Sequence, residues 1–67
     1  MIEERVGIRI KELRNKLGIS QEELAFRSGV HRTYIASLEV GKRNISIATL
    51  EKIVNALEVK FSEFFDF

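Results

Sequence analysis

Four side chains in the segment from Arg32 to Ser37 have the types and spacing for recognition by hydrogen bonds and close contact. They are Arg32, Thr33, Ala36 and Ser37. If Ile35 and Leu38 point into a core, these four point outward, because side chains on a helix repeat about every 3.6 residues. Arginine offers a planar fork of donors to O6 and N7 of guanine, and threonine offers a hydroxyl and a methyl to thymine. We therefore expect this surface to read base edges in a DNA major groove, with the small Ala36 and Ser37 allowing close approach.

Cysteine and histidine, two residue types that often carry catalysis or bind a metal, are nearly absent. The chain has no cysteine and a single histidine, His31, which excludes disulfides, thiolate metal sites and cysteine nucleophiles. A lone histidine makes neither a metal site nor half of a catalytic triad, so we interpret His31 as a surface residue at a helix cap. Without a nucleophile–base pair or a phosphate-cradling glycine loop, we expect no enzyme, no metal, no cofactor and no small-molecule ligand.

The elements that position these side chains follow from apolar spacing and from helix caps. A first helix is predicted from one apolar stripe and ends at Gly18, although Gly7 weakens its first turns; the stripe is Val6, Ile10, Leu13 and Leu17. Ser20, with Glu23 three residues later, forms a capping-box pattern that predicts a second helix over residues 21–27. Gly29 stops that helix.

Two further helices and an aromatic tail complete the prediction. A third helix is expected over residues 32–40, closing at Gly41, and a fourth over residues 47–57 with Ser46 as its cap. His31 is a poor N-cap, which puts in doubt how firmly the third helix begins. The last seven residues carry four of the five phenylalanines, and helical spacing predicts a short final turn. The chain is therefore expected to be all-α, with four or five helices in one domain over residues 1–67.

The charge is uneven along the chain although the formal net charge is only +1. Residues 5–16 include five basic residues and one acidic residue, and residues 27–43 include four basic residues and one acidic residue. Residues 51–66 include two basic residues and four acidic residues. We expect a basic pole built from the first and third quarters of the chain, opposite an acidic C-terminal pole.

Apolar runs in this sequence are short. The longest spans two or three residues, whereas about 20 are needed to cross a bilayer. We expect no membrane partner, and the lack of cysteine is compatible with a cytoplasmic location.

Several motifs in the central segment resemble one family of DNA-binding proteins. The matching residues are Ser20 to Ala25, Gly29-Val30, Thr33-Tyr34-Ile35, Leu38-Glu39 and Gly41, and they are similar to the XRE/Cro-type helix-turn-helix regulators. Residues 32–35 and 43–46 look most like the small controller proteins of restriction-modification systems. The resemblance implies a compact bundle of the lambda-repressor-like helix-turn-helix type and a sequence-specific transcriptional regulator of double-stranded DNA.

The resemblance also assigns roles to polar residues outside the third helix. It implies that Gln21 reaches a DNA phosphate and that Arg43 and Asn44 clamp the backbone, with Lys42 and Arg27 as lesser candidates that could equally be free surface charges. It places Tyr34 near base edges or backbone, although this ring could instead pack at the edge of the helix pair. It implies that Arg14 and Glu39 form a structural ion pair, so that Glu39 is no catalytic acid.

The C-terminal aromatic residues are too many for so small a core to bury. We expect some to remain exposed and to form a homodimer interface made of Ile47, Phe61, Phe64, Phe65 and Phe67. The dimer would bind an inverted repeat as its operator, with RNA polymerase as a further partner. The alternative is an antitoxin-like or protein-interaction module that uses the Phe-rich surface.

Overall fold

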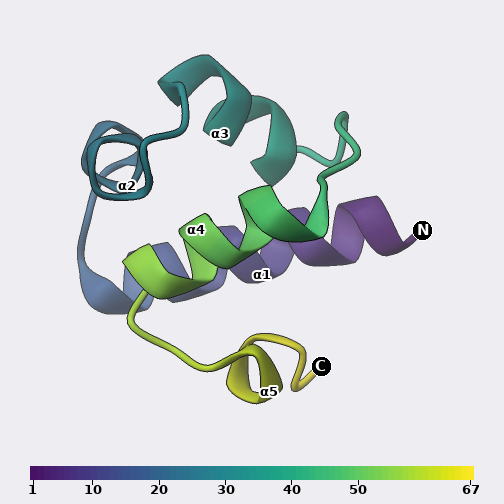
Figure 1. Ribbon diagram of the computed structural model, residues 1–67. Coiled ribbons are helices and arrows are strands. Elements are labelled where there is room, and N and C mark those ends of the chain that lie inside the picture. Colours follow the sequence, from purple (N-terminus) through teal and green to yellow (C-terminus); the bar gives the residue numbers. More distant parts are fainter.

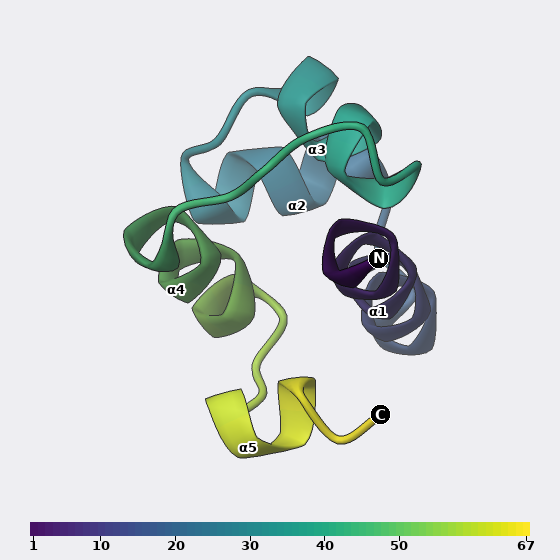
Figure 2. The ribbon, with the colours of Figure 1, turned by 90° about the vertical axis from the view of Figure 1, so that its right-hand side faces the viewer.

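The computed structural model describes all 67 residues and contains five helices. The helices are α1 (Ile2–Leu17), α2 (Gln21–Ser28), α3 (Arg32–Glu39), α4 (Ile47–Ala56) and α5 (Phe61–Phe64). Figure 1 shows α4 in front of α1, with α2 and α3 above them and α5 below. The view along α1 in Figure 2 shows the same order. The prediction of an all-α fold with four or five helices is confirmed.

The predicted caps begin and end α2 and begin α4, whereas α3 ends at Glu39 with Val40, not the predicted Gly41, as its C-cap. Ser20 Oγ accepts a hydrogen bond from the backbone N–H of Glu23 at 3.0 Å, and Ser46 Oγ accepts one from the backbone N–H of Thr49 at 3.1 Å. Gly29 ends α2 with φ of 73°, a left-handed conformation that favours glycine. His31 makes no side-chain capping bond to α3, as its residue type predicted.

Every helix contributes to one small core. Its buried apolar residues are Val6, Ile10, Leu13, Leu24, Ile35, Leu38, Leu50, Ile53, Val54, Leu57 and Phe64. The prediction that Phe64 lies at a dimer interface is wrong, because its side chain has no exposed surface. It is the largest of the fully buried side chains and anchors α5 beneath α1 and α4.

The predicted weakness at Gly7 has a packing purpose. Gly7 is buried where α1 meets α3, and a Cβ atom placed there would collide with the backbone carbonyl of Leu38. Glycine therefore lets α1 approach the backbone at the end of α3. No helix of the structure has the length and hydropathy needed to cross a membrane.

Candidate nucleic-acid interface

The outer surface of α3 carries the four side chains predicted to read bases. Arg32 and Thr33 are exposed, whereas Ala36 and Ser37 are half-buried. The Ser37 hydroxyl donates to the backbone carbonyl of Thr33 at 3.0 Å, so only its acceptor lone pairs are free. Figure 1 shows α3 at the edge of the molecule farthest from α5. The four positions lie on one helix. Arg32 has the longest side chain of the four, and it carries its donors at the tip.

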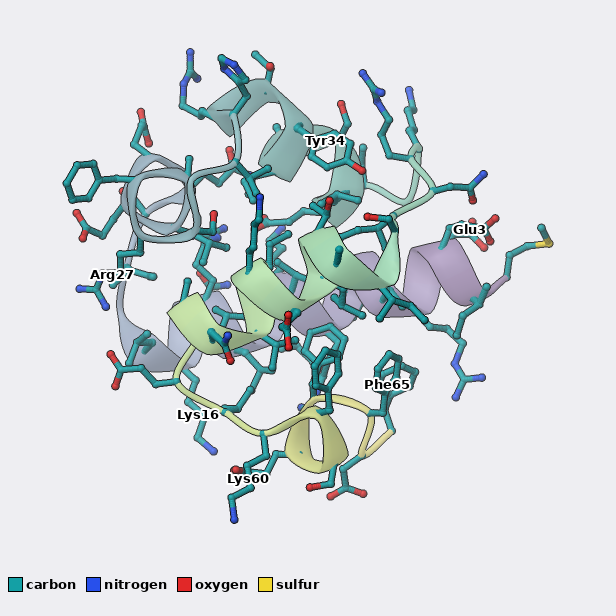
Figure 3. The ribbon with its side chains drawn as sticks, in the orientation of Figure 1. Glu3, Lys16, Arg27, Tyr34, Lys60 and Phe65 are labelled. Atoms are coloured by element: carbon teal, nitrogen blue, oxygen red, sulfur yellow. The ribbon has the colours of Figure 1, made fainter.

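Tyr34 connects α3 to the loop that follows it. The Tyr34 hydroxyl donates to the backbone carbonyl of Asn44 at 3.0 Å, and the Arg43 guanidinium lies 5.2 Å from the centre of the tyrosine ring. This geometry suits a cation–π contact. In Figure 3, Tyr34 points from α3 toward the connection to α4. Tyr34 thus holds the loop bearing Lys42, Arg43 and Asn44, while its side chain stays partly exposed.

Arg14 and Glu39 form the ion pair expected from the resemblance. Arg14 Nε donates to Glu39 Oε2 at 2.7 Å and Arg14 Nη2 donates to Glu39 Oε1 at 3.0 Å. The Glu39 side chain is only 2% exposed and that of Arg14 is 11% exposed. The hydrogen bond to Glu39 raises the pKa of Arg14; desolvation opposes this rise, and the charge of Glu39 adds to it. Arg14 therefore stays protonated, and its bonds to Glu39 tie α1 to the end of α3.

Gln21 is oriented by the same carboxylate. Its amide Nε2 donates to Glu39 Oε1 at 3.0 Å, and the side chain is half-buried at the first position of α2. The Arg14–Glu39 pair thus extends into a three-residue network that joins α1, α2 and α3. The sequence did not indicate this contact between two helix ends.

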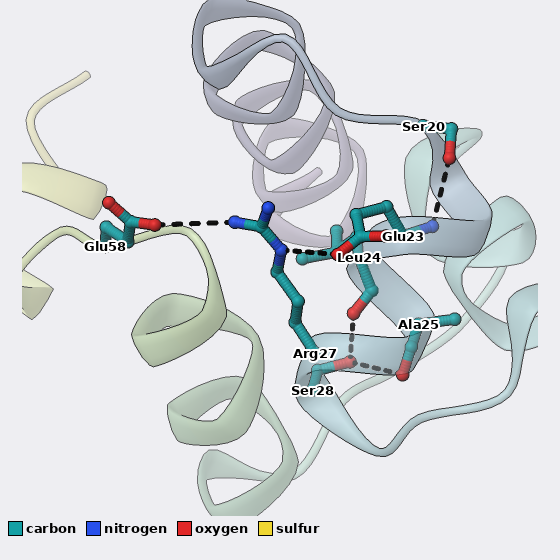
Figure 4. A network of polar contacts seen from close by, with 7 residues as sticks. All are labelled: Ser20, Glu23, Leu24, Ala25, Arg27, Ser28 and Glu58. Carbon is teal, nitrogen blue, oxygen red and sulfur yellow. Dashed lines mark hydrogen bonds and ion pairs between the residues drawn. The ribbon is translucent and has the colours of Figure 1, made fainter.

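Arg27 lies in a separate ion-pair network. Its Nε donates to Glu23 Oε2 at 2.7 Å, and its Nη1 lies 3.4 Å from Glu58 Oε2. Figure 4 shows Arg27 between Glu23 on α2 and Glu58 on the turn after α4. Figure 3 shows the side chain pointing away from α3. The expectation of a backbone contact is therefore corrected, because Arg27 joins α2 to this turn instead.

Arg5 and Arg9 on α1 do not form part of a pole beside α3. Arg9 Nε donates to the carbonyl of Phe64 at 2.8 Å and its Nη2 donates to the carbonyl of Glu63 at 2.6 Å. Arg5 Nη2 lies 3.4 Å from the carbonyl of Phe67. These cations face the C-terminal segment, which Figures 1 and 2 place on the side opposite α3. The expected contribution of the first quarter to a DNA-facing pole is thus wrong for Arg5 and Arg9, and Arg14 is used within the ion pair.

An apolar surface lies where α1, α4 and the C-terminal tail meet. It contains a groove of about 360 Å³ whose apolar lining is Ile2, Val6, Ile45, Ile47, Leu50 and Phe65. Ile47 is 80% exposed at its rim and Phe65 is 44% exposed. Phe61 and Phe67 are also partly exposed. No cluster of side chains in the structure has the composition of a metal site.

Comparisons with known proteins agree with this geometry. A family described as "Helix-turn-helix" matches residues 10–64. The control protein C.BamHI of Bacillus amyloliquefaciens is 44% identical over 62 residues, which cover 91% of this chain and 76% of that protein. The crystal structure of the restriction-modification controller protein C.AhdI from Aeromonas hydrophila is 41% identical with a TM-score of 0.90, covering 94% of this chain and 96% of that one.

A complex with DNA is among the similar structures. The restriction-modification controller protein C.Esp1396I, solved as a tetramer in complex with its natural 35-base-pair operator, is 39% identical with a TM-score of 0.93. The match covers 98% of this chain and 87% of that one. The chain described above therefore belongs to the helix-turn-helix family, among the restriction-modification controller proteins.

Proposed function

We propose that this protein is a sequence-specific transcriptional regulator of the controller type, which binds double-stranded DNA as a homodimer. One observation supports the proposal most strongly: the outer face of α3 is exposed to solvent, while the end of this helix is held in place by an ion pair with α1. Arg32 and Thr33 are exposed on this face, and Glu39 at the end of the helix is held by Arg14. A rigid helix with free donors suits insertion into a major groove.

Backbone contacts are proposed on both sides of α3. Gln21 begins α2, and Lys42, Arg43 and Asn44 lie exposed in the loop after α3. Gln21 is supported by its bond to Glu39, and Asn44 is supported by the Tyr34 bond to its carbonyl. Such groups position a protein on DNA without reading its sequence.

The apolar groove beside Ile47 is proposed as the self-association surface. A two-fold dimer uses one patch on both copies, and it would set two recognition helices about one DNA turn, roughly 34 Å, apart. The operator would then be an inverted repeat. Residues 1–67 would form one DNA-binding domain that carries its own dimerisation element at the C-terminal end.

Regulation would follow from site occupancy. A dimer bound near a promoter either blocks RNA polymerase or recruits it, according to where the site lies. We propose that the protein acts in the cytoplasm without catalysis, and that its concentration is the regulated quantity.

The proposal is tested by selecting bound duplexes from a random pool at near-physiological salt. Enrichment of an inverted repeat with half-sites about one turn apart is expected. An unenriched pool at every salt concentration would reject sequence-specific binding and favour the interaction module.

The dimer surface has its own test. Phe65→Ser together with Ile47→Ser should convert dimers to monomers in sedimentation, because both side chains line the proposed groove. Phe26→Ser is the matched control, since Phe26 is 83% exposed on α2 and does not line the groove. A wild-type monomer, or a dimer that survives the double substitution, would contradict this surface.

A further inference from the structure

Arg9 uses its whole guanidinium group inside the molecule. Besides its bonds to the carbonyls of Phe64 and Glu63 at 2.8 and 2.6 Å, its Nη1 lies 3.6 Å from Glu12 Oε1. The side chain is 21% exposed. It therefore lies against the protein with each nitrogen near an acceptor.

The two carbonyls lie at the end of α5, a helix too short to be stable on its own. α5 has only four residues, and a single turn is unstable alone because nucleation fixes several residues for one hydrogen bond. Its last carbonyls have no partner within the helix, and a cation at a helix C-terminus is favourable. Phe64 fixes α5 from the inside with a fully buried ring, while Arg9 fixes its end from α1.

Phe65 directly follows these carbonyls and forms one wall of the apolar groove. Its ring meets Phe64 edge-on at 5.0 Å and stacks with Phe61 at 6.4 Å between ring centroids. Ile2 and Ile47 also line this groove. Figure 3 shows Phe65 on the tail segment below the N-terminal half of α1. The position of this wall thus depends on where α5 ends.

We propose that Arg9 is a positioning residue for the dimer surface: it holds the end of α5 so that Phe65 completes a groove that takes a second copy of the chain. Arg9 itself does not touch the partner. The occupant is a second copy because the groove lies beside an Ile47 that is 80% exposed, so a two-fold axis at this rim places each Ile47 against the other copy's groove. The inference rests on the homodimer proposed above.

The test compares Arg9→Met with Lys11→Met in the full chain. Both changes remove one positive charge from α1, and Lys11 is exposed with no ion pair or hydrogen bond from its side chain. In sedimentation, Arg9→Met should raise the dimer dissociation constant about 10- to 100-fold, the usual effect of losing hydrogen bonds from a charged group. Lys11→Met should leave it unchanged. Arg9→Lys should recover part of the loss, since one ammonium can still donate to a carbonyl.

Two further measurements separate positioning from general stability. Circular dichroism should show the helices of Arg9→Met retained at the temperature of the assay. If Arg9 acts through Phe65, adding Arg9→Met to Phe65→Ser should weaken the dimer no further, whereas independent effects would add. A tandem chain linking two Arg9→Met copies should bind the selected duplex as the wild type does.

Three results would overturn the role of Arg9. They are a wild-type dissociation constant in Arg9→Met, full additivity with Phe65→Ser, and a tandem chain that still fails to bind. The oligomeric state of the wild-type protein is determined first. A monomeric wild type rejects the proposed dimer itself, and a dimeric wild type with an unaffected Arg9→Met rejects only the role of Arg9.

Discussion

At the scale of single residues, the candidate interface separates side chains that would read bases from those that would hold phosphates. Arg32 lies exposed at the start of α3, where a bidentate contact to guanine is geometrically possible. Asn44 lies in the loop and its backbone carbonyl accepts from Tyr34. The two residues should therefore respond differently to DNA sequence.

Arg32→Ala should cost about 1 to 3 kcal/mol on the selected operator and much less on random duplex, so that base preference is relaxed. Asn44→Ala should weaken both duplexes alike, because a phosphate contact is independent of sequence. Fluorescence anisotropy titrations with the two duplexes measure both effects. Equal losses on both duplexes for Arg32→Ala would contradict its role as a base contact.

The buried ion pair makes a second prediction at this scale. Arg14→Met leaves Glu39, whose side chain is 2% exposed, without its cationic partner and should cost about 3 to 5 kcal/mol of unfolding free energy. Replacing both partners, with Arg14→Met and Glu39→Leu, should recover much of this loss, because an apolar pair leaves no buried charge unpaired. Denaturant unfolding measures the difference. Equal stability of the single and the double variant would show that Glu39 is not effectively buried.

The raised pKa of Arg14 should not make stability depend on pH in the ordinary range. The hydrogen bond to Glu39 raises the folded-state pKa of Arg14 above its ordinary value. The stabilisation from a raised pKa is fully present below the unfolded value and is lost only as pH rises through the folded value. That window lies well above the ordinary range of pH, so Arg14 contributes no slope between about pH 5 and 9.

At the scale of elements, helix propensity alone gives the wrong sign for the effect of a substitution where α1 contacts α3. Propensity alone predicts that Gly7→Ala stabilises α1 by about 0.8 to 1 kcal/mol. The structure predicts the opposite sign, because the added Cβ would collide with the carbonyl of Leu38. The helices would have to move apart, and that movement would disturb the Arg14–Glu39 pair they share.

Gly7→Ala should therefore destabilise the fold by about 1 to 3 kcal/mol. In a domain of this size each kcal/mol lowers the melting temperature by roughly 4 to 8 °C. Asn15→Ala is the control, since Asn15 is exposed on α1 and its replacement should raise the melting temperature slightly. A Gly7→Ala variant that melts at or above the wild-type temperature would mean that α1 and α3 do not approach so closely.

At the scale of the whole molecule, the distribution of charge matters more than the net value. The formal charge is +1, but Arg5, Arg9, Arg14 and Arg27 all contact acceptors of the protein itself. The bases that remain free near α3 are Arg32 and Lys42, with Arg43 stacked on Tyr34. DNA affinity should accordingly depend on few cations per copy, supplemented by neutral donors.

The salt dependence of DNA affinity measures how many phosphates the protein neutralises. If a dimer neutralises about 6 to 10 phosphates, log affinity should fall with log salt at a slope of about −5 to −9. With so few free bases per copy, the shallow end of this range is the expected result. Lys42→Met should reduce the slope by about 2 in a dimer, one for each copy. Titrations at several salt concentrations measure it, and a slope that Lys42→Met leaves unchanged would remove Lys42 from the interface.

The sequence alone determined the helices and the residues on the face of α3. The apolar spacing, the caps Ser20 and Ser46 and the stop at Gly29 depend on neighbours a few residues apart, so they are legible in the chain. The family resemblance supplied the Arg14–Glu39 pair, whose partners are 25 residues apart.

Only the tertiary structure decided which partners the remaining residues have. Arg9 meets Phe64 across 55 residues of chain, and Arg27 meets Glu58 across 31. In the sequence both arginines look like free surface cations. One of four tail phenylalanines, Phe64, fills the core while the others stay partly exposed, and their spacing cannot rank them. The cause is common to all three cases: local pattern selects an element, whereas burial and ion pairing depend on how distant elements pack.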